Sequence, residues 1–334
     1  MSRPVTSDQK IAVFANVSQP PFANNLLPPV SALRRVAIVE LVEPHRLPGF
    51  IPTGAAAPAL VPNEPATGIA RCFRPDVVVC LGGALTISET ARRAFPPFTV
   101  FVGIALSDPL GISASVQIAP DFDLFYTQDP QTLPWYRSRG LTVRRCDHAT
   151  DPNLFQPGGR DKRIDVIFVG KWSEYREDTL AGLASKCNLA IHAHRAEQQW
   201  RLRTLEELDT PAALSGALGA ARLSIDFTRV EQPGNPFHLT HRITPRTLLA
   251  AACGVPSLIE AQTSLHGLFT PGIDIATFDG PQGLVDSVLD LLENDAQRHA
   301  LGLAARTRVL QAHTWDLRIA KILRDTEEVR LASR

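Results

Sequence analysis

The sequence predicts an α/β protein of two doubly wound domains, each a parallel sheet covered by helices, with a cleft between them. Two observations predict this fold class. Apolar runs of strand length alternate with amphipathic segments of helix length along the chain. The alternation occurs twice, and the turn-rich stretch 151–159 between the two series is typical of an interdomain linker. A chain of 334 residues also exceeds the usual size of one domain.

The composition excludes several classes of protein. Lys and Arg total 34, Asp and Glu total 34, and there is no basic tract, so we expect no nucleic-acid binding through bulk charge. No apolar run reaches the roughly 18 residues of a membrane-spanning helix, and the N-terminus lacks the apolar core of a signal peptide. We therefore expect a cytoplasmic protein without a transmembrane segment. No two cysteines have C-x-x-C spacing, which favours buried thiols over a disulfide framework or a zinc site: Cys72, Cys80, Cys146, Cys187 and Cys253.

In the first half, β-branched apolar runs flanked by Pro or Gly identify the strands. We expect them at 10–15, 36–41, 75–81, 98–103, 123–127 and 142–146. Helical spacing predicts helices at 87–95 and 128–139. Two Pro-rich stretches without a clear period, 17–29 and 43–67, are expected to be loops.

The second half repeats the pattern after the linker. Strands are expected at 164–169, 187–192, 223–227, 255–259 and 273–278. Helices are expected at 173–186, within 196–221, at 245–253, 282–293 and 295–313, and from 315 onward. Residues 228–240 are polar and read as a loop, within which 229–238 could form a mobile flap.

The helix expected at 245–253 has both of its ends marked. Thr244 can cap the first turn, Pro245 suits the first helical position, and Gly254 ends the helix. Its start presents free backbone N–H groups, and Arg246 adds a fork of donors, so a diphosphate could bind there. The alternative is an ordinary buried helix with one solvated arginine. Two further candidate phosphate ligands lie just upstream: His241 and Arg242.

Several segments of the chain also match the motifs of a known family. The helix segment Arg246-Thr247-Leu248-Leu249-Ala250-Ala251-Ala252-Cys253-Gly254 is similar to that family's R-x-F-E-x-x-A-C-G helix. The other matching segments are 126–129, 148–157, 165–170 with Arg176, 269–274 with Phe278, and 313–318. In this order and spacing, over roughly residues 120 to 325, the chain resembles the group-1 glycosyltransferases of the two-lobed GT-B fold, in particular the CgeB-like branch.

The resemblance implies a division of labour between domains. Residues 1–157 would form the acceptor domain, residues 158–312 the nucleotide-sugar domain, and residues 313–334 a helix that crosses back to the first domain. A nucleotide sugar would be the co-substrate, and no cofactor or metal would be needed, because Arg246 and a helix N-terminus can stabilise the diphosphate leaving group. Residues 1–120 fit the fold only loosely, and the acceptor remains open.

The resemblance also implies site residues. Donor contacts would come from Gly170, Lys171, Arg176 and Arg246, while Gly272 and Asp274 could border the donor sugar or simply form a turn. One position departs from the family. Leu249 stands where the family has the Glu that holds the ribose hydroxyls, and Leu cannot accept a hydrogen bond. Another acceptor could replace it: Asp226, Glu231 or Glu260.

Candidate catalytic residues lie in the first domain. An inverting enzyme would need a general base there, for which Asp108 is our first choice, with an Asp-Pro turn residue as the alternative. His148 could meet donor or acceptor, or make a structural hydrogen bond. His192 and His194 share a strand face at a spacing compatible with a metal, but no third ligand is evident, which favours a surface or cleft pair.

The sequence thus predicts a glycosyltransferase that uses a nucleotide sugar. The alternative is a non-catalytic relative that binds a nucleotide, a glycan or a protein partner, and Leu249 favours it. A nucleotide-sugar epimerase, which shares the two-lobed fold, is a third class, and it would act without an acceptor.

Overall fold

The structure is a computed structural model that divides into two compact units. It describes residues 8–17, 23–46, 58–82, 85–159, 161–193, 201–206, 208–231, 237, 239–241, 243–261, 265 and 267–332. Unit 1 comprises Met1–His148, Gln232–His238 and Trp315–Arg334. Unit 2 comprises Ala149–Glu231 and Leu239–Thr314.

Unit 1 is built on a six-stranded sheet in the order β2-β1-β4-β6-β7-β8, in which every pair of neighbours is parallel. Its strands are β1 (Lys10–Phe14), β2 (Ile38–Val42), β4 (Val77–Leu81), β6 (Val100–Ala105), β7 (Leu124–Thr127) and β8 (Arg144–Arg145). A separate parallel pair joins β3 (Ala59–Val61) to β5 (Leu85–Ile87). All six strands predicted in this half are therefore present.

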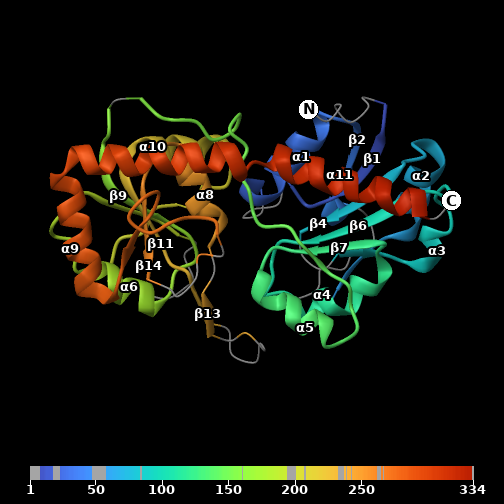
Figure 1. The fold of residues 1–334 in the computed structure, drawn as a ribbon, viewed down its shortest axis with the longest axis horizontal. Helices are drawn as coiled ribbons and strands as arrows, with labels where there is room; N and C mark the ends of the chain where they lie inside the picture. Colours follow the sequence, from blue (N-terminus) through green and yellow to red (C-terminus); the bar gives the residue numbers. More distant parts are fainter. Residues whose placement is uncertain are drawn as a thin grey trace. The chain divides into compact units, whose positions relative to one another are not determined.

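Helices cover both faces of the unit 1 sheet. They are α1 (Ala23–Arg34), α2 (Asn63–Cys72), α3 (Glu89–Arg92), α4 (Ile112–Ile118), α5 (Leu133–Arg137) and α11 (Trp315–Ala332), with 3₁₀ turns η1 (Pro44–Arg46), η2 (Ala119–Asp121) and η3 (Pro130–Thr132). On one face α2 and α3 pack against Ala12, Phe14 and Val78. On the other face α1 and α11 lie side by side (Figure 1).

The prediction of loops at 17–29 and 43–67 in unit 1 was wrong in part. Residues 17–29 run into α1, which contains Pro28 and Pro29 and still forms because Leu26, Val30 and Leu33 bury one face at helical spacing. The stretch 43–67 contains η1, β3 and the start of α2. In α1 this burial outweighs the local preference of proline, whereas Pro65 lies in the first turn of α2, where proline is tolerated.

Unit 2 is built on a five-stranded parallel sheet in the order β10-β9-β11-β14-β15. The strands are β9 (Ile164–Val169), β10 (Leu189–His192), β11 (Ala221–Asp226), β14 (Ser257–Glu260) and β15 (Ala276–Phe278), all within or next to the predicted ranges. Helices pack on both faces of this sheet through their apolar side chains. They are α6 (Glu174–Ala181), α7 (Pro211–Gly219), α8 (Pro245–Ala252), α9 (Gly280–Glu293) and α10 (Asp295–Ala312). The prediction of two doubly wound α/β domains is confirmed.

The polar stretch 228–240 is not simply a loop. It contains an antiparallel hairpin of β12 (Arg229–Glu231) and β13 (Leu239–His241). The sequence hid it because each strand is only three residues long, although Pro233-Gly234 and Asn235-Pro236 between them are turn-forming pairs. The flap hypothesis for 229–238 falls mostly on residues 232–236 and 238, outside the described residues.

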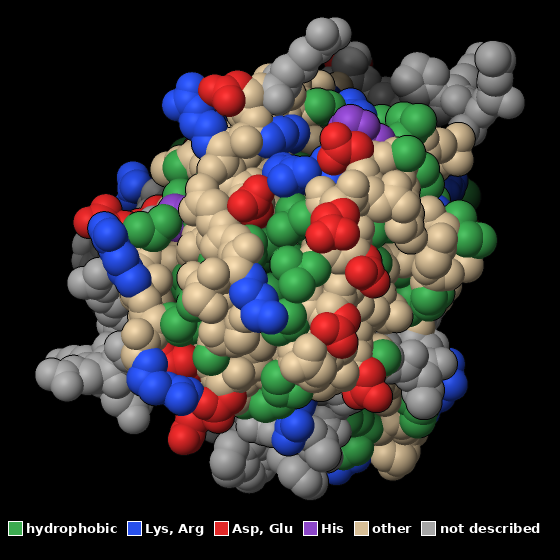
Figure 2. All heavy atoms as spheres, turned by 90° about the vertical axis from the view of Figure 1, so that its left-hand side faces the viewer, with side chains coloured by type: hydrophobic (Ala, Val, Ile, Leu, Met, Phe, Trp, Pro, Cys, Tyr) green, Lys and Arg blue, Asp and Glu red, His purple; other side chains and the backbone are tan. Residues whose placement is uncertain are grey.

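The surface carries mixed charge. Figure 2 shows one face of the molecule, where a strip of hydrophobic side chains has acidic side chains along one side and basic ones nearby. Among the residues that the structure describes, no helix is both long and apolar enough to cross a membrane. All five cysteines are free thiols, as expected, but only Cys80, Cys146 and Cys253 are buried, and Cys72 is exposed.

Candidate functional site

The strand order of unit 2 marks one place for a ligand. The order in which the chain adds strands reverses between β9 and β11. The next strand, β10, lies on one side of β9 and the one after it, β11, lies on the other, while all the strands stay parallel. Open parallel sheets bind ligands outside the carboxyl ends of the two strands at such a switch point. Gly170 directly follows β9, and Asp226 is the last residue of β11. The candidate site is therefore at this edge of the unit 2 sheet.

Helix α8 begins at the same edge, and its sequence fixes both of its ends. The Thr244 hydroxyl accepts a hydrogen bond from the Arg246 backbone N–H at 3.2 Å, and Pro245 occupies the first helical position. Gly254 adopts φ +70° directly after the helix, which favours glycine. Both predicted helix ends are confirmed, and the first turn of α8 presents its free N–H groups at the switch point.

Arg246 brings a guanidinium to this edge. Its Nε lies 4.0 Å from the Asp226 carboxylate, and a Cβ at Gly170 would come within 3.3 Å of that Nε. The side chain is 28% exposed, yet Nε is buried and has no hydrogen-bond partner among the described residues. Buried donors are rarely left unpaired, so this cation is available to an anion. The structure thus brings Gly170 and Arg246 together.

Lys171 and Arg176 lie on the other side of Gly170, at the start of α6. The Ser173 hydroxyl caps that helix by accepting from the Arg176 backbone N–H at 3.4 Å. The Arg176 guanidinium donates to the Lys171 carbonyl and lies 5.7 Å from the Phe168 ring centroid. Lys171 itself is exposed. Both cationic residues therefore sit beside the carboxyl end of β9.

Leu249 points into the hydrophobic core. It is 1% exposed and belongs to the cluster that contains Ile167, Leu248 and Ile259. Of the three carboxylates considered as replacement ribose acceptors, two already accept hydrogen bonds from other protein groups, and the side chain of the third is not described. Asp226 accepts from Thr244 and Thr247, and Glu260 accepts from Tyr175, from Thr228 and from the Arg229 backbone N–H. The side chain of Glu231 lies outside the described residues.

Two predicted phosphate ligands cannot be placed. Arg242 lies outside the described residues, and for His241 only the backbone, in β13, is described. The backbone of His241 pairs with Arg229 of β12. The hairpin β12–β13 thus leads directly into the first turn of α8.

Gly272 and Asp274 lie elsewhere in unit 2. They precede β15, so they are on the amino side of that strand, while Arg246 is at the carboxyl side of the sheet. Gly272 adopts φ +76° in a turn, and Asp274 accepts from the Thr270 backbone N–H and pairs with Arg308 at 3.4 Å. This geometry favours the turn alternative, and we leave both residues out of the donor site.

In unit 1, Asp108 is the centre of a buried polar network. Its side chain is 0% exposed and accepts from Ser115 Oγ and Thr127 Oγ1, both at 2.9 Å, and from Tyr136 Oη at 2.7 Å. Burial raises the pKa of Asp108 to about 6, although the three hydroxyl donors oppose the rise. A carboxyl enclosed in this way is not accessible to an acceptor, so the geometry favours the structural alternative over the general base.

The raised pKa of Asp108 predicts a pH dependence of stability. Because the folded state favours the protonated carboxyl, the contribution of Asp108 is fully present below its ordinary pKa of 3.8 and is lost as pH rises through about 6. We expect the loss to reach up to about 3 kcal/mol. Asp108→Asn, a neutral mimic, should remove this dependence. The check is the difference in melting temperature between wild type and variant from about pH 4 to about pH 7.5, and a constant difference would refute the protonation.

The remaining predicted histidines are scattered. His148 is buried at the end of unit 1. His192 Nδ1 lies 2.8 Å from the Glu206 carbonyl oxygen, and His194 is outside the described residues, so their pairing stays a prediction. Within the described ranges no group of His, Cys, Asp and Glu side chains is arranged to hold a metal ion.

Sequence reasoning missed one pair at the switch point of the unit 1 sheet, between β1 and β4. Asn16 follows β1, and its Oδ1 lies 3.1 Å from the His45 backbone N and 3.0 Å from His45 Nδ1. Since the amide oxygen accepts, Nδ1 donates to it, and the contact orients the His45 ring at this switch point. No local motif could reveal a pair 29 residues apart, of which Asn16 follows the strand expected at 10–15 and His45 lies in a stretch expected to be a loop.

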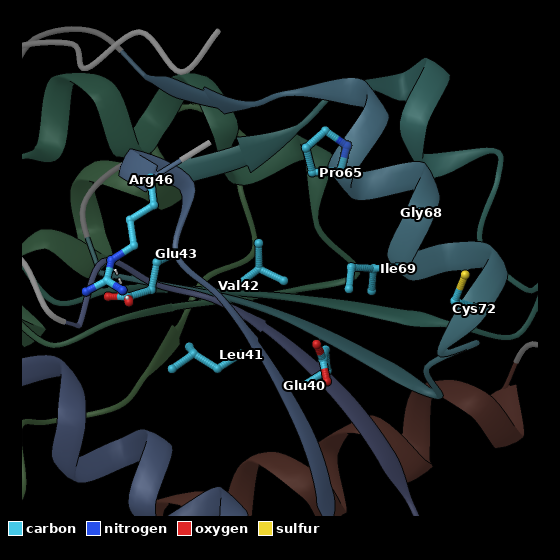
Figure 3. Close-up of a pocket in the computed structure, with 9 residues that line it drawn as sticks. All are labelled: Glu40, Leu41, Val42, Glu43, Arg46, Pro65, Gly68, Ile69 and Cys72. Atoms are coloured by element: carbon cyan, nitrogen blue, oxygen red, sulfur yellow. Dashed lines mark ion pairs between the residues drawn. The ribbon is translucent and has the colours of Figure 1, made fainter. Parts of the chain in front are cut away.

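Unit 1 also has a groove of about 580 Å³ between β2 and α2 (Figure 3). The strand contributes Leu41 and Val42, and the helix contributes Ile69. The ion pair of Arg46 with Glu43, at 3.1 Å, lies at one end. None of the predicted site residues lines this groove.

The fold is shared with solved structures. Sucrose-phosphate synthase from Thermosynechococcus elongatus aligns with a TM-score of 0.63 and 15% identity over 97% of this chain and 100% of that chain. HepE from Anabaena, solved with UDP and glucose, aligns at 0.62 and 13% identity over 95% and 100%. A putative UDP-N-acetylglucosamine 2-epimerase from Listeria monocytogenes aligns at 0.56 and 13% identity over 95% of each chain. These likenesses confirm the GT-B fold.

The sequence itself matches one family. No match is found among curated proteins. The model of a family described as glycosyl transferase-like matches residues 153–324, just over half of the chain, which includes Gly170, Arg176 and Arg246. The chain therefore belongs to the glycosyl transferase-like family.

Proposed function

We propose that this chain transfers a sugar from a nucleotide-activated donor to an acceptor, as a member of the CgeB-like branch. Unit 2 would bind the nucleotide sugar and unit 1 the acceptor. In the reaction an acceptor hydroxyl attacks the anomeric carbon, the bond from that carbon to the diphosphate oxygen breaks, and the diphosphate keeps the electron pair. The acceptor proton passes to a base or to water. Catalysis thus requires stabilisation of the negative charge that grows on the diphosphate.

One observation carries the proposal. The Arg246 guanidinium, whose buried Nε has an ionic contact with Asp226 but no hydrogen-bond partner among the described residues, lies beside the first turn of α8, at the carboxyl edge where parallel sheets bind ligands. A guanidinium and free helix N–H groups are suited to phosphate oxygens. Gly170 leaves room beside the guanidinium, and Lys171 and Arg176 supply further positive charge at that edge.

These groups suggest a metal-independent mechanism. The positive N-terminal end of α8 and the Arg246 guanidinium can supply the charge stabilisation that a divalent cation supplies in other transferases. A nucleotide sugar would then be the only co-substrate, with no resident cofactor. HepE, which shares the fold, was solved with UDP and glucose, and uridine nucleotides are therefore the first donors to test.

A specific observation favours a second candidate, a non-catalytic relative that binds a nucleotide, glycan or protein. Leu249 is buried in the core where the family has a ribose-binding Glu. An epimerase is the third class, since the Listeria protein shares the fold. Transfer to an acceptor would exclude both, and nucleotide-sugar turnover without an acceptor would favour the epimerase.

The test is a ligand panel followed by an activity assay. Nucleoside diphosphates and UDP-sugars are screened by thermal shift, where a ligand at about 100 times its Kd adds roughly 2.7 kcal/mol of stability. We expect one base to raise the melting temperature and its sugar nucleotide to be consumed. Stabilisation without consumption supports the non-catalytic relative, and no stabilisation by any nucleotide contradicts the donor site.

A further inference from the structure

We propose that Asp226 is a positioning residue that holds Arg246 and the first turn of α8 in place for the diphosphate. The inference rests on the proposed function and assigns a residue that does not itself touch the ligand. Asp226 is the last residue of β11 and is 2% exposed. A carboxylate buried to this extent is costly unless its neighbours compensate it. Those neighbours are the residues that form the candidate donor site.

One carboxylate oxygen of Asp226 holds the start of α8. Thr244 and Thr247 both donate their hydroxyls to Asp226 Oδ2, the second at 2.7 Å. Thr244 is also the residue that caps α8. The helix start is thus tied to the end of β11 through two side chains, and a negative charge beneath it is favoured by the helix dipole. The free N–H groups of the first turn are fixed relative to the sheet.

The other oxygen faces Arg246. Arg246 Nε lies 4.0 Å from Asp226 Oδ1, which is an ionic contact beyond hydrogen-bond length. A Cβ at Gly170 would come within 3.4 Å of Arg246 Cζ. The guanidinium therefore lies close to both a glycine and a carboxylate. A contact on Nε leaves the two terminal nitrogens of the fork for a ligand.

Asp226 affects an anion in two opposite ways, which makes the proposal testable. Its negative charge alone repels a diphosphate, so neutralising it would tighten binding if charge were its only influence. Its positioning of Arg246 strengthens binding, so the same change would weaken binding. Asp226→Asn keeps an oxygen for the threonine hydroxyls, removes the charge, and can turn an amide donor toward Arg246 Nε.

The experiment is calorimetric titration of UDP into wild type, Asp226→Asn and the control Thr247→Val. We expect Asp226→Asn to raise the Kd for UDP about 10-fold or more. Thr247→Val loses one of the two hydroxyls that hold the start of α8 but keeps Thr244 and the contact of Asp226 with Arg246, so its Kd should rise less than that of Asp226→Asn while its melting temperature falls. Asp226→Glu, which keeps the charge but displaces the carboxylate from the threonine hydroxyls and from Arg246, should also raise the Kd, and it serves if Asp226→Asn does not fold.

The outcomes separate two failures. If Asp226→Asn or Asp226→Glu binds UDP as tightly as wild type or more tightly, while Arg246→Ala loses binding, Asp226 is not a positioning residue but the donor site stands. If Thr247→Val weakens binding as much as Asp226→Asn, general loosening of α8 explains the effect and the proposal is wrong. If wild type binds neither UDP nor any other nucleoside diphosphate, the proposed function and this inference both fail.

Discussion

Replacing Leu249 by Glu is expected to destabilise the protein instead of restoring the family's ribose contact. Leu249 is 1% exposed within an apolar cluster that includes Ile167 and Leu248. The substitution removes a packed side chain and buries an unpaired carboxyl, at a cost of at least about 4 kcal/mol. For a chain of this size the melting temperature should fall by roughly 10 °C. Thermal unfolding at neutral pH measures this effect.

Two controls test the reason for that loss. Leu249→Met keeps the volume and should cost less than about 1.5 kcal/mol. A buried Glu has a raised pKa, so its penalty should be smaller at acidic pH, where the carboxyl is neutral, and should grow as pH rises. A Leu249→Glu variant as stable as Leu249→Met, with tighter UDP binding, would mean that this position faces the nucleotide.

The parts of the fold that follow from local chemistry could be predicted from the sequence. Thr244, Pro245 and Gly254 fix the ends of α8 through their own hydroxyl, ring and backbone freedom, and the structure has the helix there. Helix α1 could not be predicted, because Pro28 and Pro29 oppose it locally and only the burial of its apolar face in unit 1 stabilises it.

The same distinction applies to the site. Arg246 and Gly170 lie 76 positions apart, and the expectation that both contact the donor came from family motifs. The structure adds that a Cβ at Gly170 would come within 3.3 Å of Arg246 Nε, so the two residues are close in space. The role of Asp226 depends on two threonines and an arginine that meet it only after β11 and α8 pack together. Asp274 shows the converse, since its motif suggested a donor contact while parallel strand register places it at the amino side of β15. The end of the sheet at which a residue lies is set by how the strands pack together, so a local motif cannot reveal it.

Replacing Arg246 by Ala is expected to remove most of the activity while leaving the fold intact. The side chain is 28% exposed, and among the described residues its Nε has no hydrogen-bond partner and only the ionic contact with Asp226, so stability should change little. Loss of a charged donor should raise the Kd for a nucleoside diphosphate about 10- to 100-fold. Because negative charge increases on the diphosphate in the transition state, kcat should fall in addition, on the order of 10²- to 10³-fold.

The substitution Arg246→Lys separates charge from geometry. Lysine keeps the charge but lacks the planar fork, so its Kd and kcat should lie between those of wild type and Arg246→Ala. The control is Arg203→Ala, since Arg203 is an exposed arginine of the same unit, and it should leave both quantities unchanged. Titration with UDP and initial rates of donor consumption measure the two quantities. If Arg246→Ala binds UDP and consumes the donor as wild type does, Arg246 does not stabilise the diphosphate. The reaction must then use other cations at this edge of the sheet. The nearest to β9 in the chain are Lys171 and Arg176.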